Sequence, residues 1–206
     1  MADPKVKAAS IAAAQSASDQ VSAPTSAPAA PMGNASYTGF ATIREIGPLG
    51  MITLRAKPDV PGLAQAFQTL GLTQPPPRRI AINGEKAAGW MSPDEYLLIL
   101  PYAEANAALA TLTEALKGQH HVCALVSDAR AVFRIEGPKA AQVLKKLCPV
   151  DIDTLAPNEL RRSRAAQVPA AFWQEGEGYT LVCFRSVAAY MMGLLTHASA
   201  PGSELF

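Results

Sequence analysis

Residues 127–144 read Ser-Asp-Ala-Arg-Ala-Val-Phe-Arg-Ile-Glu-Gly-Pro-Lys-Ala-Ala-Gln-Val-Leu, and this stretch predicts one strand followed directly by one helix. The run Ala131–Ile135 is short and mostly apolar, as in a buried strand. Gly137 and Pro138 then open a helix, because proline is favoured at the first helical position. The apolar side of this helix holds Ala141, Val143, Leu144 and Leu147, and its lysines, expected to face water, are Lys139, Lys145 and Lys146. A strand joined to an amphipathic helix predicts a sheet covered by helices on one face.

Strand-like and helix-like segments alternate on both sides of this stretch. Further strands are predicted at Met51–Arg55, Arg79–Ile82, the segment ending at Trp90, Tyr96–Leu100, Val122–Val126, Gln167–Trp173 and Tyr179–Phe184. Hairpin turns are predicted at Asn83-Gly84 and at Glu175–Gly178. The element order before residue 125 resembles the order after it, which is a hint of duplication without a residue-level repeat. The pattern predicts an α+β fold, a two-layer sandwich of mostly antiparallel sheet with helices packed on it.

The helix starts are predicted from capping residues. Asp59 is expected to cap a helix that ends at Gly71, and Ser186 to cap a final helix with Val187, Tyr190, Met191, Leu194 and Leu195 facing inward. Ala103–Leu116 is expected to be a further amphipathic helix. Ser92-Pro-Asp-Glu95 fits a capping box, so one helical turn is expected before the next strand.

Composition restricts the classes of function. The chain has 206 residues, 49% of them hydrophobic, and a formal charge of +1, so it can bury a core and has no field to attract nucleic acid or a membrane surface. No run approaches the roughly 18 apolar residues that a bilayer span needs. Cys123, Cys148 and Cys183 are odd in number and set in apolar surroundings, which favours buried, reduced thiols and a cytoplasmic protein.

The first 36 residues differ in kind from the rest. Residues 1–36 are rich in Ala, Ser and Pro and are expected to form a disordered tail, with residues 37–206 as a single domain. Lys5 and Lys7 before an alanine-rich stretch allow a targeting segment as an alternative, but its apolar region is weak and it has no arginine.

No constellation of catalytic, cofactor-binding or metal-binding residues is predicted. The sequence contains neither G-x-G-x-x-G nor G-x-x-x-x-G-K-[ST], and Gly176-Glu-Gly178 is interpreted as a hairpin turn. His120 and His121 point to opposite faces if they lie on a strand, and His121 with Cys123 supplies only two ligands. Three arginines at 161, 162 and 164 are interpreted as a solvated face, with binding of a partner's carboxylates as the alternative.

Three segments, in this order, resemble the gamma subunits of heterotetrameric sarcosine oxidase. They are the stretch 127–144 with Cys148-Pro-Val-Asp151, the upstream Trp90-Met-Ser-Pro-Asp-Glu-Tyr-Leu-Leu-Ile99 and the downstream Phe184-Arg-Ser-Val-Ala-Ala-Tyr190. The Gly-Pro-x-Ala helix start and the Ser-Pro-Asp-Glu turn are shared more widely with the aminomethyltransferase-like folate-binding fold. The resemblance therefore implies this fold, with βαββαβ-like repeats.

The resemblance also implies a role. Heterotetrameric sarcosine oxidase demethylates sarcosine to glycine and forms hydrogen peroxide and, with tetrahydrofolate, methylenetetrahydrofolate. In that family the sites for FAD, FMN, NAD, tetrahydrofolate and zinc belong to the alpha, beta and delta subunits, and the gamma subunit is a packing partner, chiefly of alpha. The chain is thus expected to be a non-catalytic subunit of an oxidoreductase heterotetramer.

Charged and apolar residues near the resembling segments are the candidates for a partner interface. They are Trp90, Asp128, Arg130, Arg134, Arg185, Tyr190 and Met192. The alternatives are that Asp128, Arg130 and Arg134 pair with one another, and that the apolar candidates belong to the core, as most such residues do. The rival functions are a stand-alone folate-dependent aminomethyltransferase, whose family has a further C-terminal barrel region that this sequence is not expected to contain, and a free-standing folate-binding module.

Overall fold

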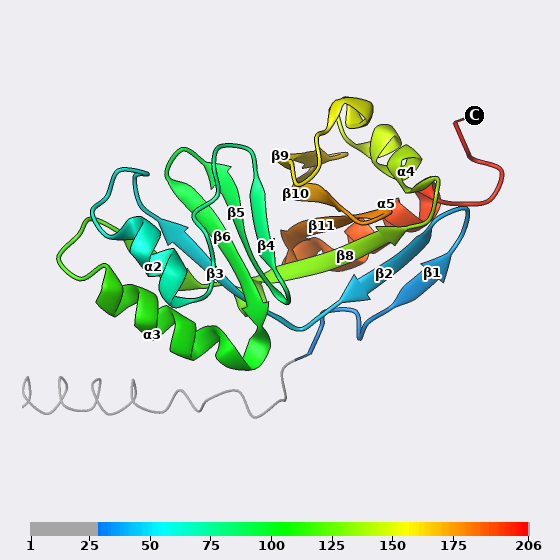
Figure 1. Cartoon of the computed structure of the whole chain (residues 1–206). Coiled ribbons are helices and arrows are strands. Elements are labelled where there is room, and N and C mark those ends of the chain that lie inside the picture. The colour runs from blue at the N-terminus through cyan, green and yellow to red at the C-terminus, as the bar shows by residue number, and fades with distance from the viewer. Residues whose placement is uncertain (1–28, 206) are drawn as a thin grey trace, which may run out of the picture.

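The computed structural model describes residues 29–205, so most of the predicted tail lies outside the described residues. Within them, two antiparallel sheets each carry two helices on one face, and the helix pairs lie on opposite outer sides (Figure 1). Among the described helices, none is long and apolar enough to cross a membrane.

The first half of the described chain forms a five-stranded sheet in the order β4-β5-β6-β3-β7. Its elements are β3 (Leu49–Arg55), α2 (Leu63–Thr69), β4 (Ile80–Asn83), β5 (Lys86–Ser92), β6 (Glu95–Pro101), α3 (Ala105–Ala115) and β7 (Val122–Leu125). The side chains of Ile52, Leu98 and Leu112 are fully buried between this sheet and its helices. Phe67 of α2 meets Tyr96 of β6 edge to face, with ring centroids 5.3 Å apart.

The second half forms a six-stranded sheet in the order β1-β2-β8-β11-β10-β9. Its elements are β1 (Ser36–Thr38), β2 (Thr42–Ile46), β8 (Arg130–Glu136), α4 (Ala140–Leu147), β9 (Leu160–Ala165), β10 (Val168–Glu175), β11 (Gly178–Phe184) and α5 (Ala188–Ala198). Ile43, Phe133 and Phe172 are fully buried against α4 and α5. The helical prediction from Gly137 and Pro138 is confirmed, because α4 starts two residues after the proline.

The two halves share one topology. The chain order β3-α2-β4-β5-β6-α3 corresponds to β8-α4-β9-β10-β11-α5, and the sheet order β4-β5-β6-β3 corresponds to β9-β10-β11-β8. The outer neighbour of β3 is β7, whereas the outer neighbour of β8 is β2, which comes from the start of the described chain. The repeated unit is therefore βαβββα rather than the expected βαββαβ.

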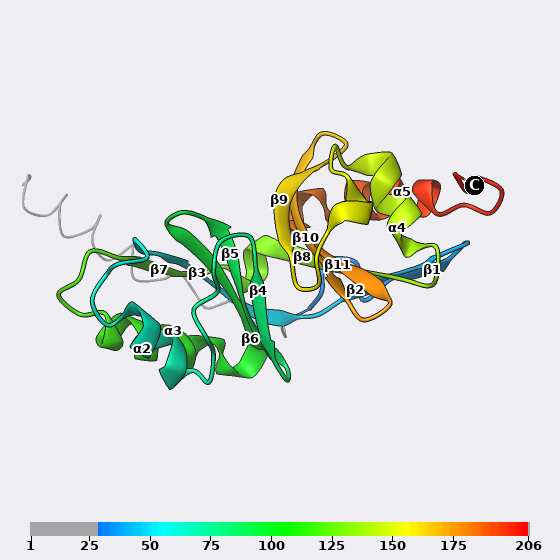
Figure 2. The same ribbon diagram turned by 45° about the horizontal axis from the view of Figure 1, so that its top comes forward.

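A third core joins the halves. Apolar residues on the faces of the two sheets that carry no helix meet in one buried cluster, which includes Met51, Leu97, Val132, Trp173 and Val182. Figure 2 shows the two sheets lying between the two helix pairs. Each half is thus a two-layer unit, whereas the sequence predicted one two-layer sandwich for the whole domain; the contact between the two sheets was not indicated by the sequence pattern.

Two of the predicted helix caps are wrong. Helix α2 begins at Leu63, and its N-cap is Gly62 in the left-handed conformation (φ 79°), with no side-chain bond from Asp59. Helix α5 begins at Ala188 after a 3-10 turn at Arg185–Val187, so Ser186 does not cap it. Met191 and Leu195 are fully buried as expected, whereas Tyr190, also expected to face inward, is 51% exposed.

The predicted helical turn at Ser92-Pro-Asp-Glu95 is instead a tight hairpin turn between β5 and β6, with Ser92 paired to Glu95. The Ser92 hydroxyl donates to Asp94 Oδ1 at 3.0 Å, and Arg55 on β3 donates to the same carboxylate. Arg55 and Ser92 together hold the pKa of Asp94 below its ordinary value. The polar residues that suggested a capping box therefore stabilise a turn.

Two of the lysines expected to face water have partners within the chain. Lys146 Nζ donates to the carbonyl of Ala198 at 2.7 Å and to Ser203, and it lies 4.8 Å from the centre of the Phe40 ring. Lys145 Nζ lies 2.7 Å from Asp153 Oδ2. The ammonium of Lys146 is drawn to the carbonyls at the end of α5, where the helix dipole is negative.

The described part of the segment before β1 is held against the sheet. Ala30 is buried, and the carboxylate of Glu45 on β2, itself only 2% exposed, accepts hydrogen bonds from the N–H of Met32 at 2.9 Å and of Asn34 at 2.9 Å. Ordered packing thus starts before residue 36, where the sequence composition placed the boundary of the tail.

Candidate functional site

Three of the seven interface candidates lie together. Asp128 is in the 3-10 turn that follows β7, Arg130 begins β8, and Arg185 is in the 3-10 turn that follows β11. They surround Phe184, the last residue of β11, which is 47% exposed. We name this region the Phe184 surface and define it by Pro31, Asp128, Arg130, Phe184, Arg185 and Ser186. An open depression of about 640 Å³ lies over it.

Strand pairing builds the centre of this surface. Phe184 and Arg130 are directly opposite each other in the β8–β11 ladder, so their side chains lie on the same face of the sheet. The Arg130 guanidinium carbon is 4.4 Å from the centroid of the Phe184 ring, a cation–π contact. Burial lowers the pKa of Arg130, and the nearby Glu95 carboxylate partly opposes this change. The sheet therefore presents a stacked arginine and aromatic pair to the outside.

A small cavity of about 60 Å³ lies beside the same guanidinium, where the β5–β6 hairpin approaches β9, β10 and β11. Its charged lining residues are Glu95, Arg130 and Arg162. Arg162 Nη1 donates to Glu95 Oε2 at 2.9 Å, so one arginine of this cavity is neutralised. For Arg130, the described residues provide the ring of Phe184 and no hydrogen-bond acceptor.

Asp128 and Arg185 are held by other parts of the chain. The hydroxyl of Tyr102 donates to Asp128 Oδ1 at 3.2 Å, and Arg185 Nη1 donates to the carbonyl of Ala29 at 2.9 Å. These bonds connect the surface to the turn before α3 and to the segment before β1. The charged candidates do not pair with one another, which was the alternative interpretation from the sequence.

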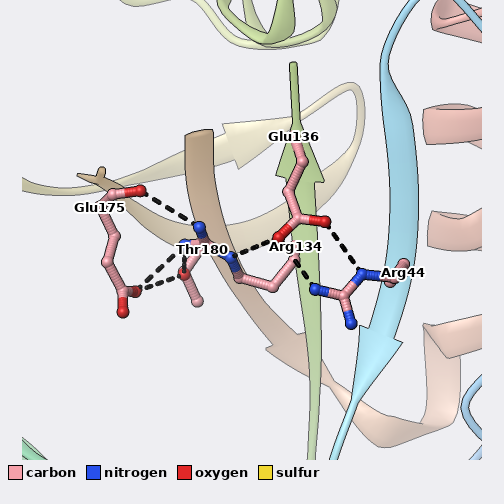
Figure 3. A network of polar contacts seen from close by, with 5 residues as sticks. All are labelled: Arg44, Arg134, Glu136, Glu175 and Thr180. Atoms are coloured by element: carbon pink, nitrogen blue, oxygen red, sulfur yellow. Dashed lines mark hydrogen bonds and ion pairs between the residues drawn. The ribbon is translucent and has the colours of Figure 1, made fainter. Parts of the chain in front are cut away.

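Arg134 belongs to a separate network on the open face of the second sheet (Figure 3). Its Nη1 donates to Thr180 Oγ1 at 2.7 Å and to Glu175 Oε2 at 3.1 Å, and Arg44 pairs with Glu136 at 2.9 Å. The bond from Arg44 holds the pKa of Glu136 below its ordinary value. Arg134 is thus satisfied within the chain, and its position indicates a structural role.

The apolar candidates are dispersed. Trp90 is half-buried against the helix-side core of the first half and lines an apolar groove of about 400 Å³ with Pro58, Gln74, Pro75, Pro76, Pro77, Pro93 and Tyr96. Met192 packs partly against the core of the second half, and Tyr190 is exposed on α5. Sequence reasoning missed Phe184, because an aromatic residue at the end of an apolar strand is usually core.

The basic run on β9 is only partly a solvated face. Arg161 Nε lies 2.9 Å from Glu159, and Arg162 is paired with Glu95, whereas Arg164 is exposed. Two of the three arginines therefore have carboxylate partners inside the chain, which corrects the interpretation of a run without partners.

The cysteines are free thiols, as predicted. Cys148 and Cys183 are buried, and burial raises the pKa of each to about 12, which keeps the nucleophilic thiolate scarce. Cys123 on β7 is only half-buried, contrary to the prediction, and burial also raises its pKa. Within residues 29–205, no group of three or more His, Cys, Asp and Glu side chains has the arrangement of a metal site.

The buried thiols predict a loss of stability in alkali. An unfolded cysteine has a pKa of about 8.5, so the folded state binds these two protons more tightly. The resulting stabilisation is complete below that pH and is lost as pH rises from there towards about 12. Urea unfolding at pH 7.5, 9 and 10 should show a decline of about 1 kcal/mol per pH unit for each thiol. The double variant Cys148→Ala, Cys183→Ala should flatten this decline; an unchanged slope would contradict the assignment to these thiols.

Comparison with known proteins agrees with the resemblance. Residues 55–201 match the model of the sarcosine oxidase, gamma subunit family. The sarcosine oxidase subunit gamma of Corynebacterium sp. (strain U-96) is 36% identical over 149 residues, covering 66% of this chain and 67% of the relative. The corresponding subunit of Arthrobacter sp. is 31% identical over 152 residues, covering 71% of this chain and 73% of the relative.

Solved structures give the same answer for the fold. The heterotetrameric sarcosine oxidase from Corynebacterium sp. U-96, in complex with pyrrole 2-carboxylate, contains a chain with a TM-score of 0.72 and 28% identity, and the match covers 80% of this chain and 87% of that chain. The glycine cleavage system aminomethyltransferase T from Bartonella henselae matches with a TM-score of 0.56 and 15% identity over 76% of this chain and 45% of that chain, which indicates a shared fold alone. The chain belongs to the sarcosine oxidase gamma subunit family.

Proposed function

We propose that this chain is the gamma subunit of a heterotetrameric sarcosine oxidase and that its role in the complex is architectural. The observation that carries the proposal is the Phe184 surface in a chain of this family. Aromatic residues and arginine are enriched at the centres of protein interfaces, and Phe184 is 47% exposed beside Arg130 and Arg185. This surface is proposed to pack on the alpha subunit.

The chemistry is proposed to belong to the partner subunits. Oxidative demethylation of sarcosine to glycine, with formation of hydrogen peroxide and methylenetetrahydrofolate, would use FAD, FMN, NAD, tetrahydrofolate and zinc held by the alpha, beta and delta subunits. The described residues of this chain support a non-catalytic subunit: its two buried thiols are kept protonated, and most of its arginines and glutamates are engaged in internal ion pairs. The free cysteines favour assembly in the cytoplasm.

The proposal is tested by co-expressing the full chain with the alpha, beta and delta subunits of a heterotetrameric sarcosine oxidase from the same source and purifying through a tag on this chain. We expect a flavin-coloured complex with sarcosine-dependent peroxide formation. A colourless monomer that binds tetrahydrofolate tightly would instead favour the aminomethyltransferase-like alternative.

Phe184→Ala should weaken this assembly. Truncating an aromatic residue at the centre of an interface typically costs about 2 kcal/mol or more of binding free energy. We therefore expect the affinity for the partner subunits to fall about 30-fold. The matched control is Ile82→Ala, because Ile82 is similarly exposed, at 39%, but lies on the edge strand of the other sheet. Equal binding by both variants would exclude the Phe184 surface as the interface.

A further inference from the structure

We propose that the guanidinium of Arg130, stacked on Phe184, is a carboxylate-binding site that takes the side-chain carboxylate of an aspartate or glutamate of the partner subunit. This inference rests on the proposed function and names the chemistry that the partner must bring. The geometry that carries it is a half-buried arginine beside a cavity of about 60 Å³ at the edge of an exposed aromatic ring.

The charge at this site is incomplete. Arg130 and Arg162 line the cavity with Glu95, and Glu95 is bonded to Arg162 at 2.9 Å. The lining therefore carries two positive charges and one negative charge. Arg130 is the unmatched one, since the described residues offer its N–H donors no acceptor. One additional negative charge would balance the site.

A partner that covers Phe184 must supply this additional negative charge. A partner that packs on Phe184 also removes water from Arg130, because the two side chains are in contact at 4.4 Å. A desolvated charge without a counter-charge costs several kcal/mol, so an interface here is stable only if the partner supplies an anion. A planar carboxylate fits the fork of N–H donors along the edge of a guanidinium whose face is occupied by an aromatic ring.

The charges that line the cavity favour a carboxylate over a phosphate. Glu95 on the same lining would repel a doubly charged phosphate more strongly than a singly charged carboxylate.

Arg130→Gln tests the site in the assembled complex. We expect the affinity for the partner subunits to fall about 30-fold, as when one member of a desolvated charge pair is truncated, and Arg130→Lys to recover part of this loss. Arg44→Gln is the control, because Arg44 is an arginine that already has Glu136 as its partner. If Arg130→Gln binds as well as Arg44→Gln while the wild-type complex still forms, the carboxylate site is overturned and the subunit role stands. If the wild-type chain does not assemble with the partner subunits, both the carboxylate site and the subunit role are contradicted.

A second measurement needs no variant. Arginine-specific chemical labelling of the wild-type chain, read by mass spectrometry, should modify Arg130 in the free chain and leave it protected in the complex. Equal labelling in both states overturns the proposal. To distinguish a free small carboxylate from a partner side chain, acetate alone is titrated into the isolated chain while the Arg130 Nε–Hε resonance is followed. A saturable shift of this resonance together with normal assembly of Arg130→Gln would assign the site to a small molecule and overturn docking.

Discussion

Replacing Phe133 with alanine should lower the free energy of unfolding by about 3–5 kcal/mol, the range found for removing a buried phenylalanine. Phe133 lies at the middle of β8, between β2 and β11, and is fully buried against α4 and α5. Its loss leaves a cavity that the paired strands on both sides cannot close. Urea unfolding followed by far-UV circular dichroism gives the measurement.

The matched variant Phe67→Ala makes this experiment informative about domain organisation. Phe67 is fully buried in the helix-side core of the other half. We propose that the described chain unfolds as one unit, because the third core and strand β2 connect the halves. Trp90 reports on the first half and Trp173 on the shared core. Both variants should therefore shift a single transition, seen alike by tryptophan fluorescence and circular dichroism. Two separated transitions in Phe133→Ala would show that the halves are independent domains.

The repeated topology explains why β2 matters for this cooperativity. In the first half, the outer strand β7 follows α3 directly, but in the second half the corresponding place is filled by β2, which precedes the first half in the chain. The described part of the chain thus contributes β1 and β2 to the second sheet, then forms the first sheet and returns to the second. Unfolding the second sheet alone would release β2 from β8 while β3 stays in place only three residues further along.

The sequence predicted the elements better than their arrangement. Strands such as β3 and β8 and the two-residue hairpin turns follow from local patterns of apolar residues and turn formers, which act over a few residues. Two predicted caps were wrong, because Gly62 rather than Asp59 is the N-cap of α2, and a 3-10 turn at Arg185–Val187 stands where Ser186 was expected to cap α5. Which local start a helix adopts depends on tertiary packing. Contact between the two sheets was not predictable, because continuous apolar runs such as Leu97–Leu100 are typical of any strand buried on both faces.

The residues of the candidate site were also easier to predict from the sequence than their arrangement. Asp128, Arg130 and Arg185 were selected as charged residues within the resembling segments, and the fold brings them together. Their neighbour Phe184 was not selected, because its exposure results from the end of the sheet at that point and has no local signal. Arg134 has the same residue type and strand as Arg130, yet only the folded structure shows that Glu175 and Thr180 satisfy it.

Replacing Glu45 with alanine should destabilise the protein by about 2–4 kcal/mol, because it deprives two backbone N–H groups of charge-assisted bonds and removes a buried side chain. The carboxylate of Glu45 is 2% exposed and holds the N–H groups of Met32 and Asn34 at 2.9 Å. Hydrogen exchange should show that these two amides lose protection, whereas Glu114→Ala, at a carboxylate 74% exposed on α3, should leave them unchanged.

Glu45→Ala should also affect binding at the Phe184 surface. Glu45 holds the segment that places Pro31 on that surface and Ala29 against Arg185, whose Nη1 donates to the Ala29 carbonyl at 2.9 Å. A loosened segment must be ordered again when a partner binds, and ordering costs about 1–2 kcal/mol for each backbone residue fixed. Glu45→Ala should therefore weaken assembly at a temperature where the variant is still fully folded, and Phe67→Ala, which lies in the other half, should not. Normal assembly of Glu45→Ala with its amides deprotected would mean that this segment takes no part in the interface.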